Sequence, residues 1–431
     1  MRSLLISAFI LFIFNCSTAQ SLTPEQVDKQ TYDAFFAKEY KTTIQLGNEA
    51  LQQGTDFYFL RYRLGVSYYE LKNYEAAIPH FEKAKELQDS DPVLLEYLYY
   101  SYFFTNRNSS ASLLAETFSG ELKAKINYKA PLFESVSVEV GLLSNPKFDS
   151  SKKLGTNSYA RGTFYSDVTF GNIVVTNAFS PKLKLYNNLS YVANTSNEII
   201  QGLKNDVITA KNNYFQWNIV GSYFTNNWTI SAGFGLYNSS YYSYTLPPPF
   251  MPNGRITSTK QTSTNYSGSA SISKRFKYIE PNISFSYANL LNYSNFTTEA
   301  SATYYPFGNI NFYGNTKVGL VSANSENNTI FTQLLGVKLS KKIWIEGFGA
   351  IGNHQNYISD NGLSVFNTPD KINWYAGSNL NVFLKNFDIS LGYGLQEREA
   401  SYLSGANPIS TKTVNYTYNY NLLKTKITWK F

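Results

Sequence analysis

The stretch WTISAGFGLY, residues 228 to 237, alternates between two kinds of side chain. Successive side chains of a β-strand point to opposite faces, so this pattern predicts a strand whose two faces differ in polarity. One face carries Trp228, Ile230, Ala232, Phe234 and Leu236, and the other carries Thr229, Ser231, Gly233 and Gly235. Strands of this kind suit a wall with lipid on the outside and water on the inside.

The same split recurs in residues 387 to 395 and at the end of the chain. From Phe133 onward, short alternating segments are separated by clusters of Asn, Ser, Gly and Pro, which favours strands joined by turns. Asn226 and Asn227 tolerate the positive φ that two-residue hairpins need. Six short connections, near 180–182, 226–227, 275–278, 306–309, 341–342 and 385–386, alternate with seven long ones, among them 144–158, 241–260 and 355–370. The sequence therefore predicts about fourteen antiparallel strands, with twelve or sixteen as alternatives.

The composition points to the same architecture. The chain contains 36 Tyr, 31 Phe and 5 Trp, and aromatic residues make up 17% of it. After residue 20, no stretch is long and apolar enough for a membrane-spanning helix, whereas a closed barrel with alternate residues facing lipid accounts for the aromatic faces. We therefore predict an antiparallel transmembrane β-barrel over residues 133 to 431. A soluble β-sandwich or β-helix is the alternative, and it leaves the aromatic faces unexplained.

The last strand carries a second signal. Leu423, Ile427, Trp429 and Phe431 share one face, and polar residues occupy the other. A terminal Phe on an amphipathic last strand resembles the signal that is read by the outer-membrane barrel assembly machinery. This resemblance implies that Ile427, Trp429 and Phe431 contact that machinery and that the barrel lies in a bacterial outer membrane, in contact with its lipid.

The N-terminus has the layout of a secretory signal peptide, with Arg2, an apolar run from Leu4 to Phe14, and small residues before Gln20. We expect cleavage before Gln20, so that residues 1 to 19 are removed. A lipoprotein acylated at Cys16 is the alternative. Loss of Cys16, the single cysteine, leaves no thiol for a disulfide or for metal chemistry.

Residues 64 to 78, LGVSYYELKNYEAAI, decide the fold of the segment before the barrel. They resemble the tetratricopeptide repeat. The positions that carry the match are Leu64, Gly65, Tyr68, Tyr74, Ala77, Phe81 and Ala84. Gly65 and Ala77 let two antiparallel helices approach closely, with the larger side chains between them. Tyr40, Ile44 and Ala50 lie 34 residues before Tyr74, Ile78 and Ala84, which indicates an earlier repeat.

A further helix is expected from Pro92, followed by a turn over 106–110 and a shorter helix that ends near Phe118. This gives about two and a half repeats. The predicted fold is thus α + β and multidomain, with an all-α repeat module over residues 20–120, a linker over 121–132 and the barrel over 133–431. The resemblance implies that the module, on the periplasmic side, docks a partner protein. The alternative is a rigid spacer without a ligand.

The order of a repeat module before a barrel resembles exopolysaccharide-export porins and surface lipoprotein assembly modulators. It favours a conduit or translocator that exports or inserts a cargo such as polysaccharide or lipoprotein. The alternative is a plugged barrel that anchors the repeats. An outer-membrane lipase or protease is a third hypothesis, with His354, beside Asn353 and Asn356, as its base. Because no Ser or Asp can be assigned as its partner, we expect His354 to be a solvated rim residue and the protein not to be an enzyme.

No cofactor or metal is expected, because His80 and His354 are far apart in the sequence and no thiol remains. His80 is expected at a helix surface or cap. The net charge is +7, but Lys and Arg are dispersed without long runs, which argues against nucleic-acid binding. The loop over 241–252 contains four prolines. Its residues Tyr244, Pro247, Pro248, Pro249 and Phe250 either constrict the pore or cap its outer rim.

Overall fold

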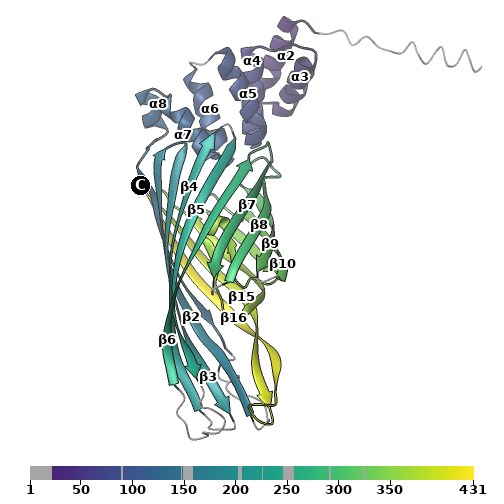
Figure 1. Cartoon of the computed structure of the whole chain (residues 1–431). Coiled ribbons are helices and arrows are strands. Elements are labelled where there is room, and N and C mark those ends of the chain that lie inside the picture. The colour runs from purple at the N-terminus through teal and green to yellow at the C-terminus, as the bar shows by residue number, and fades with distance from the viewer. Residues whose placement is uncertain are drawn as a thin grey trace, which may run out of the picture. The chain divides into compact units, whose positions relative to one another are not determined.

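In a computed structural model of the protein, helices occur up to Lys125 and strands from Phe133 onward (Figure 1). The structure describes residues 22–88, 91–146, 148, 159–201, 206–225, 227–245, 257–290, 293–323 and 326–431. The expected signal peptide, with Cys16, lies outside these residues. The chain divides into two compact units between Phe104 and Thr105, and each unit is described by itself.

The first unit contains five helices in its described residues. They are α2 (Pro24–Phe36), α3 (Tyr40–Gln52), α4 (Tyr58–Glu70), α5 (Tyr74–Leu87) and α6 (Pro92–Phe103). The starts of α2, α4 and α6 are 34 residues apart, as are those of α3 and α5, which is the period of the tetratricopeptide repeat. Thr23 and Gln26 form a capping box at α2, and Asp91 caps α6, so local chemistry fixes where these helices begin.

Two shorter helices precede the barrel and belong to the second unit. They are α7 (Asn108–Glu116) and α8 (Gly120–Lys125). Helix α7 begins inside the stretch 106–110 that the sequence predicts as a turn, and α8 lies in the predicted linker 121–132. Ser119 caps α8 through a hydrogen bond from the Leu122 amide (3.3 Å), and the Leu122 side chain is buried. The compact units therefore divide about fifteen residues before the predicted end of the module. No helix among the described residues is long and apolar enough to cross a membrane.

Fourteen strands of the described residues form a closed antiparallel barrel, as the sequence predicts. In chain order they are β1 (Phe133–Ser144), β2 (Tyr159–Ser180), β3 (Leu183–Gln201), β4 (Asp206–Thr225), β5 (Trp228–Thr245), β6 (Thr257–Lys274), β7 (Ile279–Leu290), β8 (Tyr293–Tyr304), β9 (Phe312–Ala323), β10 (Glu326–Lys338), β11 (Ile343–Ile351), β14 (Lys371–Phe383), β15 (Phe387–Gly405) and β16 (Thr411–Lys430). Pairing of β1 with β16, from Ser135 with Lys430 to Ser144 with Asn421, closes the ring.

The six predicted short connections all join neighbouring strands of the ring. Asn227 has a φ of 67°, the left-handed conformation that Asn adopts more readily than most residues. The predicted long connection 241–260 is shorter than expected. Tyr241 to Thr245 continue β5 and pair with Thr257 to Gln261 of β6, because alternating Ser, Thr and Tyr side chains favour a strand.

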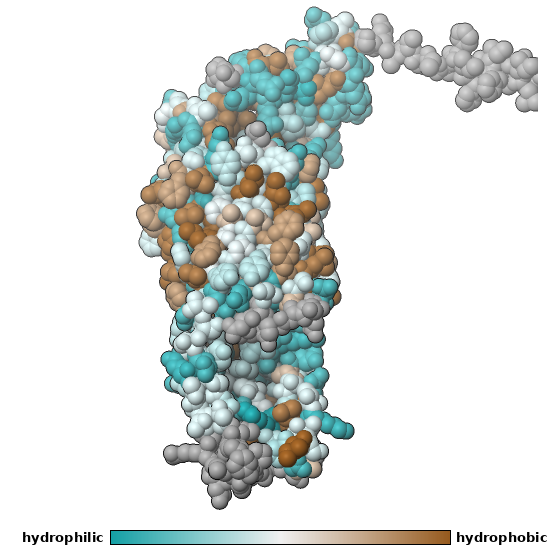
Figure 2. All heavy atoms as spheres, viewed as in Figure 1, coloured by the Kyte–Doolittle hydropathy of each residue, from teal (hydrophilic) through white to brown (hydrophobic). Residues whose placement is uncertain are grey.

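The two faces of the wall differ as the alternation predicts. On β5, Trp228, Ile230, Phe234 and Leu236 are exposed on the outside, whereas Ser231 faces inward. Figure 2 shows hydrophobic side chains gathered in a band over part of the wall, followed by a paler and more polar extension. An apolar outer band on a closed antiparallel barrel is the architecture of an outer-membrane β-barrel.

The wall is longer on one side than on the other. Strands β2 to β6, β15 and β16 have 18 to 22 residues, whereas β7 to β11 have 9 to 13. About 9 to 11 residues cross a bilayer, so the longer strands project past the shorter ones (Figure 1). In this projecting part β15 no longer pairs with β14 and pairs with β2 instead. Leu403 to Gly405 of β15 stand opposite Tyr159 to Arg161 of β2.

Candidate functional site in the barrel lumen

Small hydroxyl side chains cover the inner face of β4 to β8. Ser222, Ser231, Ser271, Ser284 and Glu299 stand opposite one another on five successive strands. A second row, one step nearer the short turns, contains Thr229, Ser273, Asn282, Ser301 and Lys317. The six serines of these two rows are named the serine wall. Side chains this small leave open space inside the barrel.

That space is a cavity of about 350 Å³. The serine wall forms one side of it, and Asp360, Asn361 and Leu363 close one end. At the other end, Tyr186, Ser222, Thr229 and Glu280 also line a second cavity of about 390 Å³. The two cavities therefore adjoin along these shared side chains.

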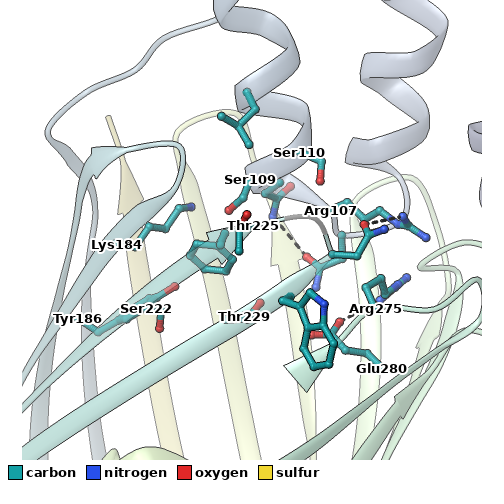
Figure 3. A pocket seen from close by; sticks show the side chains of 16 residues that line it. Arg107, Ser109, Ser110, Lys184, Tyr186, Ser222, Thr225, Thr229, Arg275 and Glu280 are labelled. Carbon is teal, nitrogen blue, oxygen red and sulfur yellow. Dashed lines mark hydrogen bonds and ion pairs between the residues drawn. The ribbon is translucent and has the colours of Figure 1, made fainter. Parts of the chain in front are cut away.

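The second cavity lies at the short-turn end of the barrel, beneath the start of α7 (Figure 3). Arg107 donates to Asn227 Oδ1 (3.3 Å) and to the Phe276 carbonyl (3.5 Å), and Arg275 donates to the Thr105 carbonyl (3.0 Å). These bonds attach the segment before α7 to the turns β4–β5 and β6–β7. Figure 3 shows the Lys184 and Tyr186 side chains on the wall across from Arg275 and Glu280.

The far end of the inner cavity is closed by the connection between β11 and β14, residues 352–370, which we name the crossing loop. It contains two paired short strands, β12 (Tyr357–Ser359) and β13 (Ser364–Phe366), joined by the short helix η1 (Asp360–Gly362). Asp360, Asn361 and Gly362 all have positive φ, which Asp, Asn and Gly adopt most readily. The turn chemistry therefore allows a sharp tip here.

The crossing loop spans the bore. In the ring order, β4 lies half-way round from β11, and η1 contacts β4, β5, β6 and β7. Ser269 of β6 donates to the Asn361 carbonyl (2.9 Å), and Asn188 of β3 donates to the Leu363 carbonyl (3.4 Å). A Cβ added at Gly233 would lie 2.4 Å from the Asn361 carbonyl oxygen, so the tip rests directly on the backbone of β5.

Buried charge holds the same loop to β8 and β9. Lys317 Nζ lies 3.7 Å from Glu299 Oε1 and 2.5 Å from Asp360 Oδ1. Tyr357 and Ser359 both donate to Glu299, the latter over 2.8 Å. Lys317 and Glu299 belong to the wall and are largely buried, whereas the Asp360 side chain is 52% exposed. The bonds of Tyr357 and Ser359 to buried Glu299, with the Lys317–Asp360 pair, therefore hold the loop against β8 and β9.

The opposite inner wall is filled by aromatic rings. Tyr416, Tyr418 and Tyr420 of β16 follow one another with ring centroids 5.9 and 5.5 Å apart. The Arg398 guanidinium lies 4.6 Å from the Tyr420 ring, and Tyr418 donates to Asp370 at the end of the crossing loop. Tyr420 also donates to the Ser166 carbonyl (2.8 Å). These three tyrosines and Arg398 are named the tyrosine wall.

The sequence proposed a different constriction. Tyr244 lies in β5, opposite Ser258, and residues 247–250 lie outside the described residues, so that constriction remains a prediction. For the residues of the crossing loop, the sequence predicts only a long connection over 355–370 and gives no position inside the bore. The alternation of Ser267, Ser269, Ser271 and Ser273 was a visible signal for a hydroxyl-rich inner face.

The sequence predicted that His354 is a solvated rim residue, and this prediction is wrong. His354 is fully buried, with ring centroids 5.0 to 5.9 Å from Tyr357, Phe366 and Tyr375. Its Nδ1 lies 3.2 Å from the Ile372 carbonyl oxygen. The rings of Tyr357 and Phe366, which belong to the crossing loop, and of Tyr375 on β14 surround His354 and bury it. Among the described residues, no group of three or more His, Cys, Asp or Glu side chains is arranged to hold a metal ion.

The repeat residues of the first unit form its interior. Leu64, Ala77, Phe81 and Ala84 are buried, and a Cβ added at Gly65 would lie 2.5 Å from the Phe81 ring. Close approach of α4 and α5 therefore requires glycine at this position. The Tyr68 ring stacks on His80 (5.4 Å), and Tyr74 packs against Tyr69 and Phe104, both at 4.9 Å.

An exposed aromatic cluster lies on the surface of α2 and α4. Tyr32, Phe36 and Phe59 are each at least half exposed, and Phe36 is the most exposed of the three at 76%. The Arg63 guanidinium lies 5.4 Å from the Tyr32 ring and 5.8 Å from the Phe59 ring, and it pairs with Asp28 (2.8 Å). These rings with an embedded Arg are typical of protein-binding surfaces.

Several ionisable groups of the first unit have shifted pKa values, and Asp56 and Tyr58 illustrate the two directions. Hydrogen bonds from Arg61 lower the pKa of Asp56. Burial, reinforced by a hydrogen bond to Asp91, raises the pKa of Tyr58. Both contacts stabilise the first unit while the Asp56 carboxyl is ionised and the Tyr58 hydroxyl is protonated.

The C-terminal residues lie where the sequence places them on β16. Ile427, Trp429 and Phe431 are exposed on the outer face, and the Trp429 ring packs edge-on against Phe387 at 4.6 Å. Their contact with the assembly machinery remains a prediction.

A profile of the tetratricopeptide repeat matches residues 58–91. The N-terminal helices contain a tetratricopeptide repeat. The matched residues cover α4 and α5, the helices that Gly65 brings together. No curated protein sequence matches the chain.

Among solved structures, the chain is similar to the Pseudomonas putida toluene transporter TodX, at 7% identity, TM-score 0.46, over 73% of this chain and 95% of that one. A Pseudomonas aeruginosa FadL homologue is 10% identical, with TM-score 0.46, over 69% and 90%. A bacterial polysaccharide outer membrane secretin is 10% identical, with TM-score 0.35, over 70% and 99%. These neighbours are named as a transporter, a FadL homologue and a secretin, and they assign no cargo to this chain.

Proposed function

We propose that this protein is an outer-membrane conduit whose bore is closed by the crossing loop and whose repeat module docks a periplasmic partner. The observation that carries the proposal is the loop tip resting on the opposite wall, at Gly233 and Ser269. A plugged anchor would also have a loop across its bore, so the conductance of a barrel without the loop distinguishes the two roles. In this proposal the loop is a gate, and the cargo is a polymer or a lipoprotein.

The orientation follows from the ends of the barrel. Residues Ser135 and Lys430 pair near the short turns, so both the entry and the exit of the barrel chain lie at that end. Outer-membrane barrels have their short turns in the periplasm. This supports a periplasmic repeat module. Delivery by a signal peptide and insertion by the barrel assembly machinery through Ile427, Trp429 and Phe431 are parts of the same proposal.

The partner surface proposed is the exposed aromatic cluster of Tyr32, Phe36 and Phe59 around Arg63. Aromatic side chains and Arg are enriched at the centres of protein interfaces. The module contains a repeat of a type that binds proteins, which supports the same role.

Conductance in planar bilayers tests the gate. We expect low conductance for the native protein and a severalfold higher conductance when residues 357–366 are replaced by a short Gly-Ser linker. Gly233→Val should act in the same direction, because its side chain would collide with the Asn361 carbonyl. Gly268→Val is the matched control, since a Cβ there would meet no atom within 4 Å.

A loop-free barrel that stays sealed would contradict the conduit and favour the alternative, a plugged anchor that presents the repeats. Equal conductance of Gly233→Val and Gly268→Val would contradict the loop tip as the seal. Retained binding of a periplasmic partner in a sealed barrel would support the anchor.

A further inference from the structure

Several polar side chains that line the inner cavity have unused hydrogen-bonding capacity, and three of them lie close together on β6, β7 and β8. Among the residues that the structure describes, Ser271 of β6, Asn282 of β7 and Ser301 of β8 have no hydrogen-bond partner for their side chains, and all three line the cavity. Neighbouring serines differ, since Ser273 donates to Glu280 (3.0 Å) and Ser284 to Glu299 (3.2 Å). These three groups therefore form one part of the wall that can bind a ligand, and among the described residues Asn361 Oδ1 at the loop tip also lacks a partner.

The positions of these groups define the span of a ligand. Asn282 stands directly opposite Ser301, and Ser271 lies diagonally across from Asn282 on the next strand. Neighbouring strands are about 4.8 Å apart, so the three groups extend over roughly 10 Å from β6 to β8. The cavity of about 350 Å³ is within the range of small-molecule sites, at its lower end.

The charges around the cavity are already paired within the protein. Lys317 has Asp360 and Glu299 as partners, Arg275 has Glu280 (3.2 Å), and Lys184 has Glu134 (2.7 Å). A charged ligand would have to replace one of these partners. The free groups themselves, two hydroxyls and one amide, are neutral and can both donate and accept.

An apolar ligand is disfavoured because it cannot form hydrogen bonds with the free groups. It would displace water from Ser271, Asn282 and Ser301 without replacing the hydrogen bonds, and an unsatisfied buried polar group costs about 1–3 kcal/mol. A ligand with hydroxyl groups at close spacing satisfies all three. Sites built on hydrogen bonds to hydroxyls discriminate strongly against analogues that lack them.

Access to the cavity is from the short-turn end. The tip of the crossing loop, with Asp360 and Asn361, closes the opposite end. Tyr186 lines both cavities and offers a ring edge or face near the entrance. A ligand therefore enters past the start of α7, whose residues line the second cavity.

We propose that this cavity binds a neutral polyhydroxylated solute, a short saccharide segment, through Ser271, Asn282 and Ser301. As a binding site the inference stands by itself. As the identity of the transported cargo it rests on the proposed conduit. The saccharide lies below the crossing loop, so the loop separates a loaded cavity from the other side of the barrel.

Saturation-transfer NMR on the full chain tests this proposal. The protein is held in a zwitterionic detergent, because glycoside detergents carry a sugar of their own. The probes are cellobiose and maltose as neutral saccharides, glucuronate as a charged one, and toluene as an apolar solute. We expect transfer to at least one neutral disaccharide, and little or none to glucuronate or toluene.

The triple variant Ser271→Ala, Asn282→Ala, Ser301→Ala should weaken disaccharide binding at least about tenfold, since three hydrogen bonds of ordinary strength are removed. Ser271→Phe should weaken it by filling the cavity. Ser322→Ala is the control, because Ser322 is exposed on the outer face of β9. Cold-gel mobility, which distinguishes folded from heated barrels, verifies that each variant is folded.

Unchanged binding in the triple variant would overturn the proposal, and so would preferential binding of toluene or glucuronate or no binding of either disaccharide. These results do not depend on conductance. If the loop-free barrel stays sealed but cellobiose binds at this site, the conduit is contradicted and the saccharide site is supported. If the loop-free barrel conducts but binds no sugar, the saccharide site is contradicted and the conduit is supported.

Discussion

The serine wall and the tyrosine wall belong to opposite sides of the ring of strands and are built in opposite ways. On β4 to β8, small hydroxyl side chains leave a cavity of about 350 Å³. On β16, Tyr416, Tyr418 and Tyr420 fill the space with stacked rings beside Arg398. The crossing loop lies between them. The difference shows that side-chain volume, at constant strand number, decides which part of a barrel is solid and which part is open.

The largest expected effect is on the tyrosine wall. Tyr420→Ala removes a fully buried ring and its bond to Ser166, and large-to-small changes of this kind cost about 3–5 kcal/mol. We expect a clear drop in the urea midpoint of the barrel in micelles. Tyr393→Ala, on the exposed outer face of β15, is the control. If both variants unfold at the same urea concentration, the tyrosine wall does not stabilise the barrel.

An intermediate effect is expected where the crossing loop meets the wall. Glu299→Ala removes the acceptor of Tyr357 and Ser359 and one of the two partners of Lys317. Loss of buried acceptors costs about 1–3 kcal/mol each, and here the cost falls on the loop. Residues 352–370 should exchange amide hydrogen faster in mass spectrometry.

The control for this variant is Glu346→Ala. Glu346 also lies in the lumen, but its partners Tyr313, Asn379 and Asn381 belong to the wall. Exchange in the crossing loop should therefore remain at its native rate. Equal acceleration in both variants would show that the Glu299 network does not hold the loop.

The smallest effect is expected on the serine wall. Ser301→Ala removes a hydroxyl with no partner among the described residues, so the barrel should lose less than about 0.5 kcal/mol. Ser222→Ala breaks the hydroxyl contact with Ser231 (2.8 Å) and should cost about 1 kcal/mol. Urea midpoints compare the two. A larger loss for Ser301→Ala would mean that its hydroxyl is structural rather than free for a ligand.

The ring of strands was predictable because its determinants are local. The alternation at Trp228 to Leu236 assigns each face, and turns such as Asn227 end the strands. The strand count of fourteen followed from the six short and seven long connections. The 34-residue spacing of Tyr40 and Tyr74 likewise predicted an earlier repeat, and in the structure helices α3 and α5 begin at these residues.

The lumen was not predictable in the same way, because its contacts join residues far apart in the chain. Glu299 meets Tyr357 and Asn188 meets Leu363 across 58 and 175 residues. The sequence marked the proline-rich loop near Tyr244 as unusual by composition, whereas the crossing loop has ordinary composition. Its one local sign was Asp360-Asn361-Gly362, three residues that tolerate left-handed backbone.

The crossing loop draws its anchors from β3, β5, β6, β8 and β9 while its two ends belong to β11 and β14. It can dock only after more than half of the cylinder exists. Resistance of this segment to a protease added during membrane insertion would therefore time the completion of the ring, and a chain arrested before that stage would be cut first at residues 352–370.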